Sequence, residues 1–168
     1  PIGLFCQQAM QVLRGSKVYV ADLSNERLEV AKKLGAVRVI NPRDEDVVAV
    51  MKEATGGEGA DLSVDAVGSG ITKRTAVDAI RPGGGSVWIG LHEDEMTFNS
   101  YGLTLPEKQV FGSYAATIDE LQHALNLMSE GKVDAESWVQ RFSLEDGVEA
   151  FQRMLAAKGN DIKAVVCP

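Results

Sequence analysis

The feature that most constrains this chain is a repeated alternation of short apolar runs with stretches of helical periodicity. Residues 17–21 (KVYVA) form the first such run, and residues 24–34 follow with apolar side chains at Leu28, Ala31 and Leu34. A short continuous apolar run is typical of a buried strand, whereas apolar residues three or four apart lie on one face of a helix. Strands that alternate with helices of this length predict βαβ units, and therefore a parallel sheet with helices on both faces.

The same alternation continues along most of the chain. Further strands are expected at residues 37–40, 61–66, 86–91, 108–112, 138–142 and 162–167. Helices are expected at residues 3–13, 44–54 and 70–80, then after Thr117 and after Asp146. The run Pro82-Gly-Gly-Gly predicts a turn, and residues 96–104 are expected to form an irregular loop. The predicted fold class is therefore α/β, with a doubly wound parallel sheet.

Residues that favour helix starts precede several of these segments. They are Ser24, Asp44, the pair Thr117 and Glu120, and the pair Ser143 and Asp146. The helix after Thr117 is expected to bury one apolar face, made of Leu121, Ala124, Leu125 and Met128. The last helix carries one apolar face as well, made of Val148, Phe151 and Leu155.

Charge and composition restrict the partners. The formal net charge is −7, and an acidic surface repels phosphate backbones, so no nucleic-acid partner is expected. No apolar run approaches the roughly 20 residues that a membrane span needs, so no membrane association is expected. Cys6 and Cys167 lie at opposite ends of the chain in no metal-ligand spacing. This favours reduced thiols and a cytoplasmic location over a disulfide.

The turns after the strands are where an open parallel sheet binds its ligands. Asp22 follows the strand at residues 17–21, and a carboxylate there can accept hydrogen bonds from both hydroxyls of an adenosine ribose. Gly3 lies 19 residues earlier, at the start of a helical segment. In the dinucleotide motif G-x-G-x-x-G, the last glycine lies about 20 residues before this acid. The spacing indicates a dinucleotide site, although a glycine and an aspartate also coincide in this way by chance.

Two later strand ends combine apolar side chains with a glycine, in the runs Asp65-Ala66-Val67-Gly68 and Ile89-Gly90-Leu91. Backbone of this kind can approach a flat ring closely, with its N–H and C=O groups available to the ligand. Ordinary tight turns between a strand and a helix have the same composition. Taken alone, these residues leave both interpretations open.

Six segments follow one another along the chain: PIG, VYVADLSNERLEVAKKLGA, VINPRDED, TGGEGADLSVDAVGS, PGGGSVWIGL and SLEDGVEAFQRM. As an ensemble they resemble the cofactor domain of the zinc-dependent medium-chain dehydrogenases, such as sorbitol, threonine and alcohol dehydrogenases. The resemblance implies a Rossmann-like NAD-binding domain at residues 1–132, truncated before its first strand. It also implies a C-terminal segment at residues 133–168 that in the family packs on the catalytic domain.

The resemblance also assigns roles to individual residues. Gly3 would be the last glycine of the phosphate-binding motif, and Ile2 would face the pyrophosphate and the nicotinamide. Asp22 would hold the adenosine ribose and favour NAD over NADP, and Arg27 would lie near the same ribose unless it is only a solvated surface residue. Ala66, Val67 and Gly68 would flank the adenosine and nicotinamide ribose, and Ile89, Gly90 and Leu91 would line the nicotinamide edge.

The departures from the family concern its catalytic machinery. The first two glycines of the motif and the strand before them do not occur, and a sheet without that central strand would fall into two halves. The N-terminal domain that supplies the zinc ligands in the family does not occur either. We assign no catalytic and no metal-ligating residue, and we interpret His92 and His123 as surface residues. Without that domain the last third would expose apolar side chains, which favours a homo-oligomer. These side chains are Trp138, Phe142, Phe151 and Met154.

The leading hypothesis is the cofactor-binding part of an alcohol or polyol dehydrogenase that uses NAD, with zinc bound by the catalytic domain. The chain alone is expected to be inactive. One alternative is a zinc-free parent similar to quinone reductases, against which Asp22 argues because that branch usually favours NADP. The others are a binding module that only holds a dinucleotide and a folded remnant that binds nothing.

Overall fold

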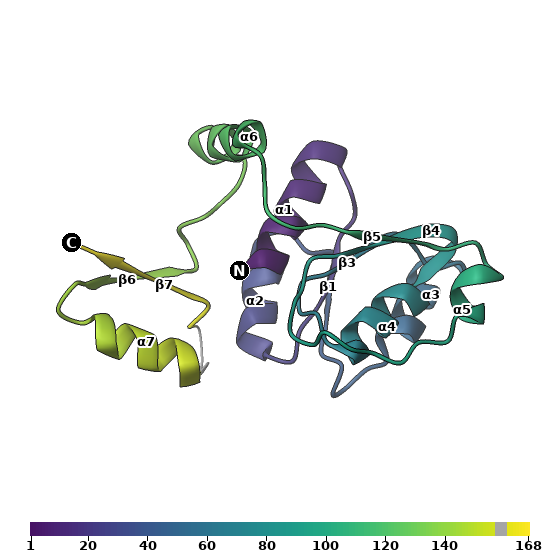
Figure 1. Ribbon diagram of the computed structural model, residues 1–168. Helices are drawn as coiled ribbons and strands as arrows, with labels where there is room; N and C mark the ends of the chain where they lie inside the picture. Colours follow the sequence, from purple (N-terminus) through teal and green to yellow (C-terminus); the bar gives the residue numbers. More distant parts are fainter. Residues whose placement is uncertain (157–160) are drawn as a thin grey trace. The chain divides into compact units, whose positions relative to one another are not determined.

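The computed structural model describes residues 1–156 and 161–168, which divide into two compact units (Figure 1). The first unit consists of Pro1–Asn41 together with Ile118–Pro168, and the second consists of Pro42–Thr117. The paired strands of both units run parallel. The predicted α/β class with parallel strands is thus confirmed.

The N-terminal part of the first unit alternates helices with short strands. Its elements are α1 (Ile2–Arg14), β1 (Tyr19–Ala21), α2 (Asn25–Lys33) and β2 (Arg38–Ile40). Strand β1 pairs with β2 in parallel, with Val20 opposite Val39. As predicted, Ser24 caps α2, because its hydroxyl accepts a hydrogen bond from the backbone N–H of Arg27. Helix α1 ends at Gly15, whose φ of 63° is a conformation that glycine adopts at little cost.

The C-terminal part of the first unit forms a second βαβ arrangement. Its elements are α6 (Ile118–Ser129), β6 (Val139–Ser143), α7 (Gly147–Ala156) and β7 (Lys163–Cys167). Strands β6 and β7 pair in parallel, and α7 lies beside them (Figure 1). The Ser143 hydroxyl accepts from the backbone N–H of Asp146 at 3.3 Å, which confirms the predicted start signal before α7. Helix α6 begins directly after Thr117, also as predicted.

The core of the first unit contains residues from both its N-terminal and its C-terminal part. Leu4, Ala31, Trp138 and Ile162 form one buried cluster. The rings of Phe5 and Trp138 meet edge to face, with centroids 5.0 Å apart. Trp138 is only 5% exposed, so the expectation that it would be uncovered is wrong. The same expectation is confirmed for Phe151, which is 66% exposed, whereas Phe142 and Met154 are half-buried.

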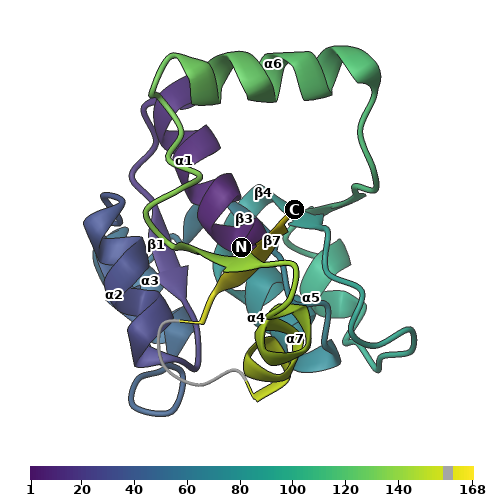
Figure 2. The ribbon, with the colours of Figure 1, turned by 90° about the vertical axis from the view of Figure 1, so that its left-hand side faces the viewer.

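The apolar face of α6 is not buried, contrary to the prediction. Leu121 and Leu125 are 55% and 56% exposed, and none of the residues of α6 is buried. Figure 2 shows the helix running past the end of α1 with most of its length apart from the other elements of its unit. The periodicity of residues 118–129 therefore identified an amphipathic helix correctly, but not whether another element covers it.

The second unit is built on a three-stranded parallel sheet. Its elements are α3 (Val47–Ala54), β3 (Ala60–Asp65), α4 (Gly70–Asp78), β4 (Ile80–Trp88), α5 (Tyr101–Thr104) and β5 (Gln109–Gly112). The strands are ordered β3-β4-β5, and α4 packs against β3 and β4 (Figure 1). Val77 of α4 and Ile80 of β4 are almost completely buried, which places the core between this helix and the sheet.

Three local predictions in the second unit are wrong. The run Pro82-Gly-Gly-Gly does not separate a helix from a strand, because β4 already begins at Ile80 and passes through it as a bulge. The N-cap of α3 is Asp46 rather than Asp44, since the Asp46 carboxylate accepts from the backbone N–H of Ala49 at 3.0 Å. The predicted loop at residues 96–104 ends in the short helix α5.

The strands fall into separate sheets, β1-β2 and β3-β4-β5, with β6-β7 as a third. No helix among the described residues is long and apolar enough to cross a membrane. Cys6 and Cys167 are free thiols, as predicted, and burial raises the pKa of the Cys6 thiol.

Candidate functional site

The first half of the predicted site is the turn that follows β1. The backbone N–H of Asp22 donates to the Ile40 carbonyl at 3.2 Å, which extends the pairing of β1 with β2 by one residue. The Asp22 carboxylate accepts from the backbone N–H of Ser24 at 2.9 Å through Oδ1. This hydrogen bond fixes the half-buried carboxylate at the carboxyl end of β1, where an open parallel sheet binds its ligand.

The N-terminus of α1 shares the neighbourhood of this turn. Arg27 and Asp22 both lie within electrostatic range of the first residue of the chain. Ile2 and Gly3, the next two residues, are exposed. The start of α1 and the turn after β1 carry the four site residues predicted in this unit: Ile2, Gly3, Asp22 and Arg27.

The second half of the predicted site is a crossing of two backbone segments after β3 and β4. The Asp65 carbonyl accepts from the backbone N–H groups of Ile89 and Gly90, at 2.9 and 3.0 Å. A Cβ atom on Gly68 would overlap the carbonyl group of Gly90, and one on Gly90 would overlap the backbone of Val67 and Gly68. Gly68 also has a φ of 91°, which other residues rarely adopt. Only glycine fits at either position.

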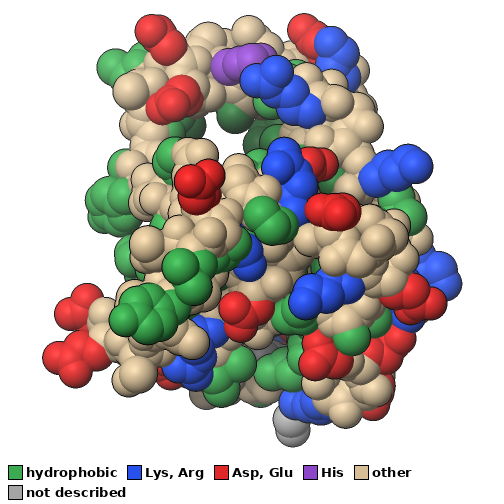
Figure 3. Space-filling model, turned by 90° about the vertical axis from the view of Figure 1, so that its right-hand side faces the viewer, with side chains coloured by type: hydrophobic (Ala, Val, Ile, Leu, Met, Phe, Trp, Pro, Cys, Tyr) green, Lys and Arg blue, Asp and Glu red, His purple; other side chains and the backbone are tan. Residues whose placement is uncertain are grey.

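Apolar side chains border this crossing. Val67 is 53% exposed and Leu91 is 76% exposed, while Ala66 and Ile89 are half-buried. Together with Gly68 and Gly90 they complete the six site residues predicted in the second unit. Exposed apolar side chains beside bare backbone make a surface on which a flat ring can lie. The space-filling view in Figure 3 shows other apolar side chains at the surface, scattered among charged ones.

Sequence reasoning missed two residues beside this crossing. Asp65, at the end of β3, is 4% exposed and accepts from the backbone N–H of Val67 at 3.3 Å. Glu93 lies in the polar run at residues 92–95, beside His92, which we interpreted as a surface residue, and its carboxylate accepts from the backbone N–H of Gly70 at 2.6 Å. The local sequence of residues 92–95 contains no signal for this contact, because Gly70 is 23 positions away.

A metal site is not supported by the residues present. His92 and His123 are exposed. Among residues 1–156 and 161–168, no group of three or more histidine, cysteine or acidic side chains could hold a metal ion. The donor set that zinc requires, usually four nitrogen or sulfur ligands or three with a water, is therefore not found in the part of the chain that the structure describes.

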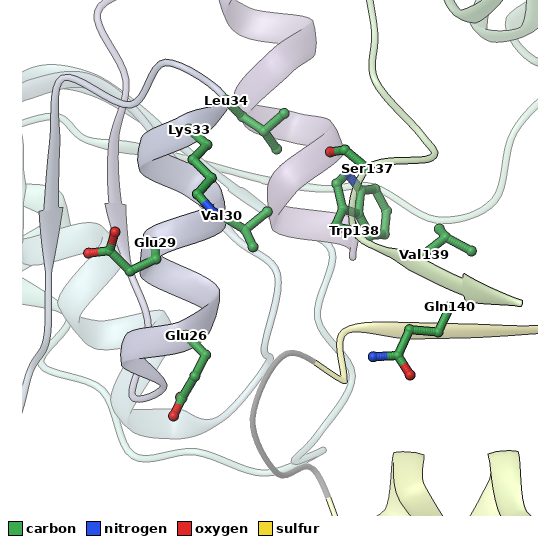
Figure 4. Close-up of a pocket in the computed structure, with 9 residues that line it drawn as sticks. All are labelled: Glu26, Glu29, Val30, Lys33, Leu34, Ser137, Trp138, Val139 and Gln140. Carbon is green, nitrogen blue, oxygen red and sulfur yellow. The ribbon is translucent and has the colours of Figure 1, made fainter.

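One hollow of the first unit is lined by none of these residues. A cavity of about 340 Å³ opens between α2 and the start of β6 (Figure 4). Its walls combine charged side chains of α2 with the indole of Trp138. They are formed by Glu26, Glu29, Val30, Lys33, Leu34, Ser137, Trp138, Val139 and Gln140. None of the ten predicted site residues contributes to it.

Comparisons with known proteins show which family the chain is similar to. Residues 1–130 match the family described as zinc-binding dehydrogenase. D-xylulose reductase A of Aspergillus oryzae is 32% identical over 95% of the chain, and an alcohol dehydrogenase of Geobacillus stearothermophilus is 38% identical over 87%. The crystal structure of 2R,3R-butanediol dehydrogenase from Bacillus subtilis superposes on all of the chain with a TM-score of 0.88 at 29% identity.

The chain matches only part of the length of these relatives. The chain corresponds to 46% of the Aspergillus reductase, 42% of the Geobacillus enzyme and 48% of the Bacillus structure, and so spans about half the length of each. The family match covers most of the chain and includes all ten predicted site residues. This chain belongs to the zinc-binding dehydrogenase family.

Proposed function

We propose that the chain is the NAD-binding part of an alcohol or polyol dehydrogenase. The observation that carries the proposal is the Asp22 carboxylate, held at the carboxyl end of β1 beside the start of α1. One carboxylate oxygen already accepts from Ser24, and the other can accept from the ribose hydroxyls. A 2′-phosphate at the same place would bring a second negative charge against Asp22, so NAD is favoured over NADP.

The residues of the second unit are suited to contact a flat ring of a dinucleotide. At the glycine crossing, the backbones of Gly68 and Gly90 lie so close together that a Cβ atom on either residue would overlap the other segment. Val67 and Leu91 offer apolar contacts to a ring beside it. NAD bound there would supply a hydride acceptor, and the part of the chain described here would bind and orient it. The full protein would act on an alcohol or polyol, as the names of its relatives indicate.

Zinc is not assigned to this chain. The donor set for it is not found among the described residues, so no step of the reaction is derived through the metal. The zinc-free alternative, with a preference for NADP, would require a nucleotide site that tolerates a 2′-phosphate. The carboxylate of Asp22 argues against that alternative on electrostatic grounds.

Calorimetric titration with NAD, NADP and AMP tests the proposal. We expect NAD and AMP to bind more tightly than NADP, and Asp22→Ala to weaken NAD and AMP by about tenfold or more, because a charge-assisted hydrogen bond is lost. Asp44→Ala removes the same charge from an exposed turn and serves as the matched control. Absence of heat with folded protein would favour the folded-remnant alternative, and equal affinity for NADP would favour the quinone-reductase-like one.

Self-association is the second part of the proposal. Apolar side chains of α6 and α7 are exposed within the first unit, including Leu121, Leu125 and Phe151, and uncovered faces of this kind favour association. Sedimentation velocity across a hundredfold range of concentration should show a rising average mass. The double variant Leu121→Gln, Leu125→Gln should reduce the rise, and a monomer at all concentrations would contradict the proposal. A cytoplasmic location remains a prediction.

A further inference from the structure

Several hydrogen bonds join the segment that follows β4, residues 89–97, to the N-terminal part of α4 and the residues just before it. Residues 89–91 leave the strand at the glycine crossing, and residues 92–97 then turn back along the helix. Four hydrogen bonds join the two: Glu93 N–H to Gly68 O at 3.0 Å, Gly70 N–H to Glu93 Oε2 at 2.6 Å, Lys73 Nζ to Glu93 O at 3.2 Å, and Arg74 Nη1 to Thr97 O at 2.7 Å. Three of the four involve Glu93.

The contact of Glu93 with α4 is favourable for two reasons. Gly70 is the first residue of the helix, so its backbone N–H has no partner inside the helix. The positive end of the helix dipole also attracts a carboxylate. Ser69 accepts from Thr72 and thereby satisfies another of the free N–H groups. Glu93 thus satisfies the first free N–H group of α4, that of Gly70.

Lys73 holds the backbone of Glu93 from the opposite side. It is only 9% exposed, and its ammonium group lies 5.5 Å from the centroid of the Trp88 ring. The same ammonium donates to the Glu93 carbonyl. The segment at residues 89–97 is therefore held through both the side chain and the backbone of Glu93.

We propose that Glu93 is a positioning residue for the nicotinamide end of the cofactor. By capping α4 it fixes the backbone at residues 89–91, which ends two positions before it and lies across Gly68. The inference rests on the proposed NAD-binding function and deepens it. It says that a contact outside the nicotinamide-binding residues determines their backbone conformation. Glu93 itself does not contact the cofactor.

The affinities of the 168-residue chain for NADH and for AMP distinguish a positioning role of Glu93 from a general loss of folded structure. AMP occupies only the adenosine half, so a positioning role of Glu93 affects NADH alone. We expect Glu93→Ala to weaken NADH by about tenfold, as the loss of one charge-assisted hydrogen bond would, and to leave AMP unchanged. Glu93→Gln keeps an acceptor oxygen and should restore most of the affinity for NADH. Glu95→Ala, an equal loss of charge two residues away, is the matched control.

Hydrogen exchange measured by mass spectrometry provides a second readout that needs no ligand. In Glu93→Ala, peptides that cover residues 70 and 89–97 should exchange about tenfold faster or more, while those from β5 remain unchanged. Unchanged exchange at residues 89–97, or equal weakening of NADH and AMP, would overturn the proposal. A wild-type chain that binds neither nucleotide would instead overturn the proposed function, and with it the cofactor role of Glu93.

Discussion

The two groups of candidate site residues, one in each unit, are built in different ways. In the second unit, the group at Gly68 and Gly90 is defined by backbone that crosses so closely that no side chain fits. In the first unit, the group at Asp22 is defined by the charge of a half-buried side chain on a turn, held by one short hydrogen bond. Adding a side chain at the glycine crossing should therefore reduce the stability of the fold, because it creates overlap. Removing the charge of Asp22 should instead reduce the affinity for the nucleotide, by the free energy of the contact that is lost.

The largest effect is therefore expected at the glycine crossing. Gly68→Ala places a Cβ atom on the Gly90 carbonyl and forces a residue with a side chain to keep a φ of 91°. Strain and overlap together should cost more than about 3 kcal/mol of unfolding free energy, as measured by urea denaturation. Gly56→Ala is the control, since Gly56 also has a positive φ but no atom near its Cβ position. Equal costs for the two variants would show that the crossing is not tight.

The next effect is expected on binding rather than on folding. Asp22→Asn keeps the shape of the turn and an acceptor for Ser24, but removes the negative charge. NAD affinity should fall by about threefold to tenfold, discrimination against NADP should shrink, and the unfolding midpoint should stay nearly constant. Calorimetry with both nucleotides checks this. A large change in stability with no change in nucleotide preference would mean that Asp22 acts only as a structural residue.

A smaller effect is expected at the cap of α2. Ser24→Ala removes the hydroxyl that accepts from Arg27 N–H, at a cost of about 1 kcal/mol in unfolding free energy. The hydrogen bond from Ser24 N–H to the Asp22 carboxylate should persist, because its donor is the backbone and not the hydroxyl. Ser24→Asp retains a capping oxygen and should restore the midpoint of urea unfolding. Failure to do so would exclude capping as the cause.

The smallest effect concerns the pH dependence of the stability of the first unit. Hydrogen bonds from Ser137, and then from the backbone of Glu136, lower the pKa of Asp134 from its ordinary 3.8. Its stabilising contribution is complete above pH 3.8 and is lost as the pH falls through the lower folded value. The contribution should stay below about 1 kcal/mol, because water screens this largely exposed group. Urea midpoints between pH 2.5 and 6 should therefore depend less on pH in Asp134→Asn than in the wild type.

Much of the fold followed from local pattern, and the errors have identifiable causes. Among the described residues, the apolar runs and periods predicted all seven strands and six of the seven helices, and they missed the short α5. The start of β4 was misplaced because a glycine-rich run forms a turn in one context and a bulge in another. The face of α6 was predicted to be buried because periodicity indicates an apolar face, while its partner is a property of the whole protein.

The sequence by itself determined the order of the elements and the residue types at the ends of the strands, including Asp22, Gly68 and Gly90. These depend on neighbours within a few positions, where backbone geometry and side-chain patterning act directly. Only the tertiary structure decided that Gly68 crosses Gly90 and that Glu93 caps α4. Both contacts join residues more than 20 positions apart, and they form only after parallel pairing places β3 beside β4.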